Sequence, residues 1–142
     1  MIILGADHAG FELKETLKNY LQELNEDILD VGAYKVDSED DFSTFVKLMA
    51  KSFKDYPDSQ IIAVCGSGVG MNIGLNKQKG VFCCLGHTVE EVVKAREHNN
   101  INALALGGRT TEVENAKQMV KAFLTTKHLG GKYTKRMTDI DL

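Results

Sequence analysis

The chain has 142 residues, of which 43% are apolar, and a formal net charge of −3 at pH 7. This length and composition predict one domain, residues 1–142, that is large enough to bury a core of ordinary size. The acidic balance provides no basic surface for nucleic acid or an anionic membrane, and three cysteines without CxxC or Cys/His spacing argue against a disulfide framework and a zinc site.

Five short apolar runs bounded by Gly or Asp predict buried β-strands. They lie at residues 2–4, 28–31, 61–64, 81–85 and 103–106. Between them, apolar residues recur at the spacing of amphipathic helices. Because a parallel sheet needs strands that are buried on both faces and helices that connect them, the sequence predicts an α/β fold. We expect a three-layer αβα sandwich with a Rossmann-like parallel sheet of about five strands.

The first predicted strand begins directly after Met1, without the basic segment and cleavage site of a secretory signal. Every apolar stretch is also too short to span a membrane. We therefore expect a cytoplasmic protein that binds neither membrane nor nucleic acid.

An acid and an imidazole follow the first predicted strand, in the segment GADHAG that contains Asp7 and His8. Ligands of open α/β sheets bind beyond the carboxyl ends of the strands, so both side chains are candidates for substrate binding. The alternative is that Asp7 only caps the helix that follows.

The loop after the third strand, CGSGVG, carries the strongest local signal. It opens with Cys65 and continues with alternating glycines, Gly66, Gly68 and Gly70. Such glycines let successive N–H groups turn inward as an anion-binding nest, and the next helix directs its positive end at the same anion. This field favours the thiolate that a catalytic base needs; the alternative is a buried apolar cysteine. A dinucleotide fingerprint is disfavoured, because Met71 stands at its third glycine.

Two further candidate sites lie later in the chain. The helix predicted after the fourth strand begins at His87 and runs to REHNN, which places His98 and Asn99 at its end. A histidine there is often only a partner of the helix dipole, whereas the adjacent asparagines favour a functional site. Arg109 follows the fifth strand in GGR, where it reaches either a phosphate or a surface ion-pair partner.

The last segment, residues 125–142, carries two glycines and then the basic residues Lys132 and Arg136 before a short apolar finish. We expect this segment to be a tail that docks elsewhere, on a neighbouring subunit. Cys83 and Cys84 lie inside a predicted strand and are interpreted as packing residues.

Taken together, five motifs resemble the family of type B ribose-5-phosphate isomerases and galactose-6-phosphate isomerase subunits. The motifs are GADHAG, CGSGVGMNI, REHNN, GGR and the terminal GGKYTKR, and they are spread over nearly the whole chain. The resemblance implies a Rossmann-like sandwich and a homodimer or homotetramer with active sites shared between subunits. It also implies an aldose–ketose isomerase of a sugar phosphate that works through an enediolate, with no cofactor and no metal.

By position, the resemblance assigns three residues to catalysis. Cys65 would carry the proton between the two carbons, Ser67 would assist at the reacting hydroxyl, and His98 would open the sugar ring. The substrate would be held by Asp7 at the sugar, by the backbone of Gly66, Gly68 and Gly70 and by Asn99 at the enediolate, and by His8, Arg109, Lys132 and Arg136 at the phosphate. Several charge-assisted donors suit a phosphate dianion.

Two positions depart from the family's pattern. The family commonly has Asp-Tyr-Pro after the second strand, where this chain has Asp41, Phe42 and Ser43, and Lys132 stands where an arginine is usual. The favoured hypothesis is isomerisation of ribose 5-phosphate to ribulose 5-phosphate. The departures leave open a galactose-6-phosphate isomerase subunit that forms tagatose 6-phosphate, or a non-catalytic sugar-phosphate-binding partner of a second, related subunit. A flavodoxin-like cofactor binder is a further alternative, since that fold also places glycine loops at strand exits.

Overall fold

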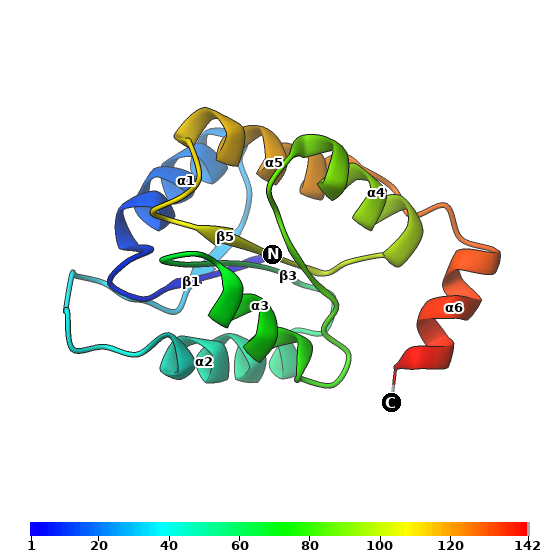
Figure 1. Cartoon of the computed structure of the whole chain (residues 1–142), viewed down its shortest axis with the longest axis horizontal. Helices are drawn as coiled ribbons and strands as arrows, with labels where there is room; N and C mark the ends of the chain where they lie inside the picture. Colours follow the sequence, from blue (N-terminus) through cyan, green and yellow to red (C-terminus); the bar gives the residue numbers. More distant parts are fainter. Residues whose placement is uncertain (142) are drawn as a thin grey trace.

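The chain folds around one sheet of five parallel strands, described over residues 1–141 by a computed structural model (Figure 1). The strands are β1 (Ile2–Ala6), β2 (Ile28–Asp30), β3 (Gln60–Cys65), β4 (Cys83–Leu85) and β5 (Ala103–Gly107), and their order in the sheet is β2-β1-β3-β5-β4. Every pair of neighbours is parallel. The predicted fold class and the number of strands are confirmed.

The strand ends differ from the predicted ones for local reasons. β1 and β5 extend beyond their apolar runs because the small residues that follow still pair with β3. β4 begins at Cys83, later than predicted. The Phe82 N–H donates to the Asn102 side chain at 2.8 Å, and the Val81 N–H donates to the Gln78 carbonyl at 3.1 Å, so neither residue continues the strand.

Within residues 1–141, six helices accompany the sheet. They are α1 (Phe11–Glu23), α2 (Phe42–Asp55), α3 (Val69–Asn76), α4 (Val89–Asn99), α5 (Val113–Thr125) and α6 (Lys132–Ile140). α1, α4 and α5 lie on one face of the sheet, and α2 and α3 lie on the other (Figure 1). α4 begins two residues after the predicted start at His87, because the Thr88 hydroxyl caps it by accepting from the Glu91 N–H at 3.2 Å.

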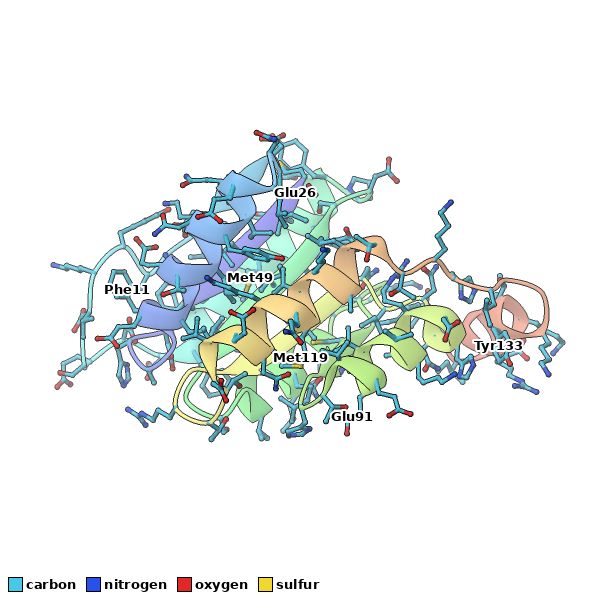
Figure 2. All side chains as sticks on the ribbon, turned by 90° about the horizontal axis from the view of Figure 1, so that it is seen from above. Phe11, Glu26, Met49, Glu91, Met119 and Tyr133 are labelled. Carbon is cyan, nitrogen blue, oxygen red and sulfur yellow. The ribbon has the colours of Figure 1, made fainter. Side chains whose placement is uncertain are left out.

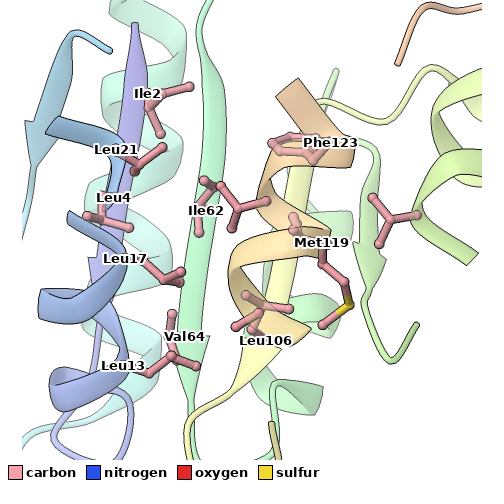
Figure 3. Packing of buried hydrophobic residues seen from close by; sticks show 14 of the residues in the cluster. Ile2, Leu4, Leu13, Leu17, Leu21, Ile62, Val64, Leu106, Met119 and Phe123 are labelled. Atoms are coloured by element: carbon pink, nitrogen blue, oxygen red, sulfur yellow. The ribbon is translucent and has the colours of Figure 1, made fainter. Parts of the chain in front are cut away.

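The sheet divides the apolar core into two clusters. One lies under α1 and α5, where Leu17 and Phe123 are fully buried against the strands (Figure 3). The other lies under α2 and α3, around Met49 and Met71. The single core expected from composition is therefore two half-cores, as strands that are apolar on both faces require.

One charged side chain is fully buried at the edge of the first cluster. The ammonium group of Lys14 donates to both carboxylate oxygens of Asp30, each at 3.0 Å, and to the Ala33 carbonyl. Lys18 donates to the same carboxylate at 3.0 Å. Burial opposes ionisation of Asp30, but a backbone N–H and the two lysines outweigh it and lower the pKa of Asp30. These contacts fix the turn that follows β2.

The tail predicted at residues 125–142 contains a helix, α6, which packs beside α4 at one end of the molecule (Figures 1 and 2). The His128 ring joins the tail to α4 through the Glu97 carbonyl at 2.9 Å and contacts the Thr134 hydroxyl at 3.0 Å. Docking of the tail on a neighbouring subunit stays a prediction. Among the helices of residues 1–141, none has the length and apolar character needed to cross a membrane.

Candidate active site

The carboxyl ends of β1, β3 and β5 lie side by side and form the floor of the candidate site. Ala6 of β1 pairs with Val64 of β3, and Cys65 of β3 pairs with Gly107 of β5. The loop after β1 leads to α1 on one face of the sheet, and the loop after β3 leads to α3 on the other (Figure 1). Open α/β sheets bind ligands at such a switch point.

Asp7 holds the first of these loops in place. It is 7% exposed, and its Oδ1 accepts from the N–H groups of Ala9 at 3.0 Å and Gly10 at 3.1 Å. These bonds close the turn that leads into α1, whose N-cap is Gly10, so Asp7 has a structural role in the turn and does not cap the helix itself. A hydrogen bond from Asp7 to the sugar stays a prediction.

Cys65 ends β3 at the start of the glycine loop. The residue is buried, and the loop that it opens is joined to the end of β5 by two backbone hydrogen bonds. The Gly108 N–H donates to the Cys65 carbonyl at 2.7 Å, and the Arg109 N–H donates to the Gly66 carbonyl at 3.0 Å. The thiol therefore lies on a backbone that two neighbouring strands hold.

The glycine loop leaves several N–H groups available to an anion. Gly68 has a φ of +81°, and a Cβ there would lie 2.9 Å from the Leu106 carbonyl carbon, so only glycine fits. The N–H groups of Gly66, Ser67 and Gly68 make no hydrogen bond within the described part of the chain, while the Val69 N–H donates to Ser67 Oγ at 3.3 Å. With the N-terminus of α3, these groups have the form of an anion-binding nest.

Arg109 lies against the glycine loop. Its Nη1 is 3.4 Å from the position that a Cβ on Gly66 would take, so the missing side chain makes room for the guanidinium group. Arg109 is exposed and has no salt-bridge partner among residues 1–141. The ion-pair alternative finds no partner there, and the guanidinium group is available to an anion.

Sequence reasoning missed Asp40, which contacts His8. Asp40 lies 32 positions further along the chain, and its Oδ1 accepts from both the His8 backbone N–H at 3.0 Å and the ring Nδ1 at 2.7 Å. This hydrogen bond is the main cause that raises the pKa of His8; the charge of Asp7 adds to it, and burial and Arg109 oppose it. Asp40 lies ten positions beyond the last residue of β2, whereas Asp7 directly follows β1, so the strand-exit rule did not select Asp40.

Asp7, His8 and Asp40 could together hold a metal ion. Each offers one ligand atom, and the three atoms lie within 4.8 Å of one another. However, Nδ1 of His8 and Oδ1 of Asp40 are bonded to each other, and Oδ1 of Asp7 accepts from two backbone N–H groups. These three atoms therefore already have hydrogen-bond partners, and the expected absence of a metal stays a prediction.

A second group of predicted site residues lies on α4 and α6. The His98 ring stacks on the Tyr133 ring, with centroids 4.6 Å apart and an angle of 13° between the planes. Lys132 Nζ and the Arg136 guanidinium carbon lie 5.2 Å and 5.6 Å from the centroid of the same ring. Asn99 also contacts α6 through its side chain. Tyr133, which sequence reasoning missed, therefore joins His98, Lys132 and Arg136.

The structure does not bring the two groups together within one chain. α4 runs back from the carboxyl end of β4 to the amino end of β5, so its last residues, with His98, lie at the amino edge of the sheet (Figure 1). β5 extends about 13 Å, at about 3.3 Å per residue, from Ala103 to Gly107. Because Cys65 pairs with Gly107 at the far end of β5, His98 and Cys65 are beyond hydrogen-bond reach of each other.

The remaining cysteines lie in the edge strand β4. Burial raises the pKa of Cys83, and the Cys84 charge adds to this effect. Burial, together with the charge of Glu91, also raises the pKa of Cys84. Both thiols therefore stay protonated at neutral pH, as their interpretation as packing residues requires.

Comparison with known proteins identifies similar chains over nearly the whole length. A family model described as ribose/galactose isomerase matches residues 2–140. Ribose-5-phosphate isomerase B of Mycobacterium tuberculosis is 37% identical over 139 residues, which cover 98% of this chain and 86% of that protein.

Solved structures are similar over the same range. The crystal structure of a ribose 5-phosphate isomerase from Thermotoga maritima matches with a TM-score of 0.94 and 36% identity, over 99% of this chain and 96% of that one. Ribose-5-phosphate isomerase B of Mycoplasma genitalium, solved with bound ribulose 5-phosphate, matches with a TM-score of 0.94 and 31% identity, over 98% of this chain and 92% of that one.

Proposed function

The chain belongs to the ribose/galactose isomerase family, and we propose that it interconverts ribose 5-phosphate and ribulose 5-phosphate. It is an aldose–ketose isomerase that acts on a sugar phosphate. The bound ribulose 5-phosphate in the Mycoplasma genitalium structure supports this choice of sugar. A phosphate dianion crosses bilayers poorly, which supports a cytoplasmic enzyme.

One observation carries the mechanism: the buried Cys65 lies beside the unpaired N–H groups of the glycine loop. In the open-chain aldose, the Cys65 thiolate takes the proton from C2, and the electron pair moves to the C1 carbonyl oxygen to form an enediolate. The Ser67 hydroxyl group carries a proton from O2 to O1. The thiol then returns its proton to C1, and the C2 carbonyl forms.

The glycine loop lowers the barrier to this transfer. Negative charge develops first on O1 and then on O2, and the N–H groups of Gly66, Ser67 and Gly68 are fixed in place before that charge appears. Preorganised donors of this kind stabilise an enediolate more than they stabilise the neutral sugar. Gly70 lies in the first turn of α3, and the positive end of this helix adds to the same field.

Phosphate binding combines groups from both edges of the sheet. His8 and Arg109 lie at the carboxyl edge, beside the loop that holds Cys65. Lys132 and Arg136 lie on α6, on the far side of the molecule. All four are cationic or can become so, and a phosphate dianion is bound best by several charge-assisted donors.

We therefore infer a homodimer in which α4 and α6 of one chain complete the crevice of the other. The separation of His98 from Cys65 supports this arrangement, because one chain alone cannot present both to one sugar. In a two-fold dimer, each chain gives its carboxyl edge to one site and its α4–α6 end to the other. His98 then opens the sugar ring as a general acid and base, and Asn99 contacts the enediolate.

Phe42 makes the choice of sugar worth testing. Its ring lies against the glycine loop, with Cζ 2.9 Å from the position that a Cβ on Gly70 would take. The phenolic hydroxyl group that the family's motif implies is absent from this place. Galactose 6-phosphate therefore enters the test as the substrate of the second candidate function.

The test measures isomerisation of ribose 5-phosphate, galactose 6-phosphate and allose 6-phosphate by the purified protein. Cys65→Ala is expected to abolish turnover without unfolding the protein, and Cys84→Ala, which removes a thiol outside the site, is expected to leave turnover unchanged. Full activity of Cys65→Ala would refute the assigned base. A wild-type protein that is silent on all three sugars would refute the proposed function of this homodimer.

A further inference from the structure

Asp40 holds His8 at two points. The same carboxylate oxygen accepts from the His8 backbone N–H at 3.0 Å and from its ring Nδ1 at 2.7 Å, although the two residues are 32 positions apart. We propose that Asp40 is a positioning residue that keeps the imidazolium of His8 directed at the substrate phosphate. This inference rests on the proposed function, because it presumes that His8 binds phosphate.

The hydrogen bond decides which ring nitrogen faces the ligand. A carboxylate accepts only from a protonated nitrogen, so Nδ1 of His8 carries a proton in this contact. Nε2 is then left as the outward nitrogen, and it has no partner in the hydrogen bonds of residues 1–141. When the ring is doubly protonated, Nε2–H becomes a charge-assisted donor to a phosphate oxygen.

The charges around His8 make protonation a condition for binding. Asp7 and Asp40 both lie close enough to raise the pKa of His8, and Arg109 is the opposing cation. Oδ2 of Asp40 is buried without a hydrogen-bond partner within the described residues, so its charge is not otherwise compensated. With a neutral His8, a phosphate would meet two carboxylates and one arginine. With His8 protonated, the pair that it forms with Asp40 is neutral overall.

The backbone fixes the segment that carries Asp40. The Ala33 N–H donates to the Ala6 carbonyl at 2.7 Å, and the Ala6 N–H donates to the Gly32 carbonyl at 2.8 Å. The buried Lys14 also donates to the Ala33 carbonyl. The start of the segment is thus tied to the end of β1, two residues before His8, and seven residues after Ala33 the chain is joined to His8 itself by Asp40.

The test compares Asp40→Asn with the wild-type enzyme and with the matched control Glu39→Gln. An asparagine oxygen can still accept from Nδ1, so the variant removes the charge and retains the contact. Glu39 is an exposed acid in the same segment, so its variant removes an equal charge away from His8. KM and kcat for ribose 5-phosphate are measured from pH 6 to pH 9, and the His8 titration is followed by NMR. The phosphate also titrates near pH 6, but this effect is common to all three proteins.

We expect Asp40→Asn to raise KM about tenfold at alkaline pH and much less at acid pH, with kcat nearly unchanged. The NMR titration midpoint of His8 is expected to fall in Asp40→Asn and to stay in place in Glu39→Gln. If the KM profiles of Asp40→Asn and the wild-type enzyme superimpose and the His8 midpoint does not move, the role of Asp40 is wrong. Wild-type turnover of ribose 5-phosphate would still support the proposed function. If the wild-type enzyme isomerises none of the sugars, the proposed function fails, and the NMR midpoint together with the pH dependence of inorganic phosphate binding still decides the role of Asp40.

Discussion

Mixed dimers provide the sharpest test of a site shared between subunits. Cys65→Ala removes the proposed base from the carboxyl edge, and His98→Ala removes the proposed ring-opening group from the opposite edge, at least the length of β5 away. Each change alone damages both sites of a homodimer. A heterodimer of the two variants has one site with both changes and one with neither, because each chain contributes its two ends to different sites.

The expected magnitude follows from this count. A heterodimer purified through two different affinity tags is expected to show about half of the wild-type kcat per dimer, and an unsorted equimolar mixture about a quarter. The homodimers set the background: loss of an acid–base group lowers turnover by about 100-fold or more. Coupled spectrophotometric detection of ribulose 5-phosphate resolves these levels easily.

A control heterodimer of Cys65→Ala with Cys65→Ser has no intact site and is expected to stay at background. If the Cys65→Ala and His98→Ala heterodimer is no more active than its two parent homodimers, the argument from sheet geometry is wrong. The site would then need both residues from one chain, which requires α4 to leave its position on the sheet.

Three further measurements test the framework around the site. Gly68→Ala is expected to destabilise the fold by about 1–3 kcal/mol, because φ is +81° and the new Cβ would lie 2.9 Å from the β5 backbone; an unchanged thermal unfolding midpoint would contradict this. Asp30→Asn is expected to cost about 3 kcal/mol at pH 7, because it removes the carboxylate that accepts two hydrogen bonds from the buried Lys14 and leaves only the partly exposed Glu15, 3.2 Å from its Nζ. Folding lowers the pKa of Asp30. The wild-type protein is therefore more stable than Asp30→Asn above the unfolded-state pKa, and this difference in the free energy of unfolding is lost as the pH falls through the folded-state pKa. We expect the urea unfolding curves of the two proteins to converge in acid. A chelator is expected to leave kcat/KM unchanged, because the ligand atoms of His8 and Asp40 are bonded to each other; activity that one divalent metal restores would show the opposite.

The sheet was predictable because its central strands are buried on both faces and therefore read as continuous apolar runs. Apolar patterning is informative only where burial is complete. β4 lies at the edge of the sheet, and the hydrogen bond that the Phe82 N–H donates to the Asn102 side chain determines where it begins, so its start was predicted too early. α6 was missed as a helix, although Tyr133, Met137 and Ile140 recur at helical spacing, because two glycines and a basic cluster dominate that segment.

Asp40 illustrates what local pattern could not provide. It lies in an irregular segment with no apolar period, and tertiary contacts set the path of that segment: Lys14 and Asp30 anchor its start, and Ala33 pairs with the end of β1. Strand-exit reasoning selected Asp7 and Cys65 because each lies at the carboxyl end of a long buried strand. β2 has only three residues, and nine residues lie between its last one and Asp40, so the same rule did not reach that far.

The division of the site, in contrast, follows from connectivity alone. In a parallel sheet with helical crossovers, every strand ends at one edge and every crossover helix ends at the other. The CGSGVG motif follows a strand and REHNN ends a helix, so the two motifs lie at opposite edges of any single chain with this fold. Their separation is therefore not a detail of one loop that a small movement could close. A reaction that needs Cys65 and His98 on the same sugar requires two chains, and the symmetry that supplies the second chain produces two such sites at once.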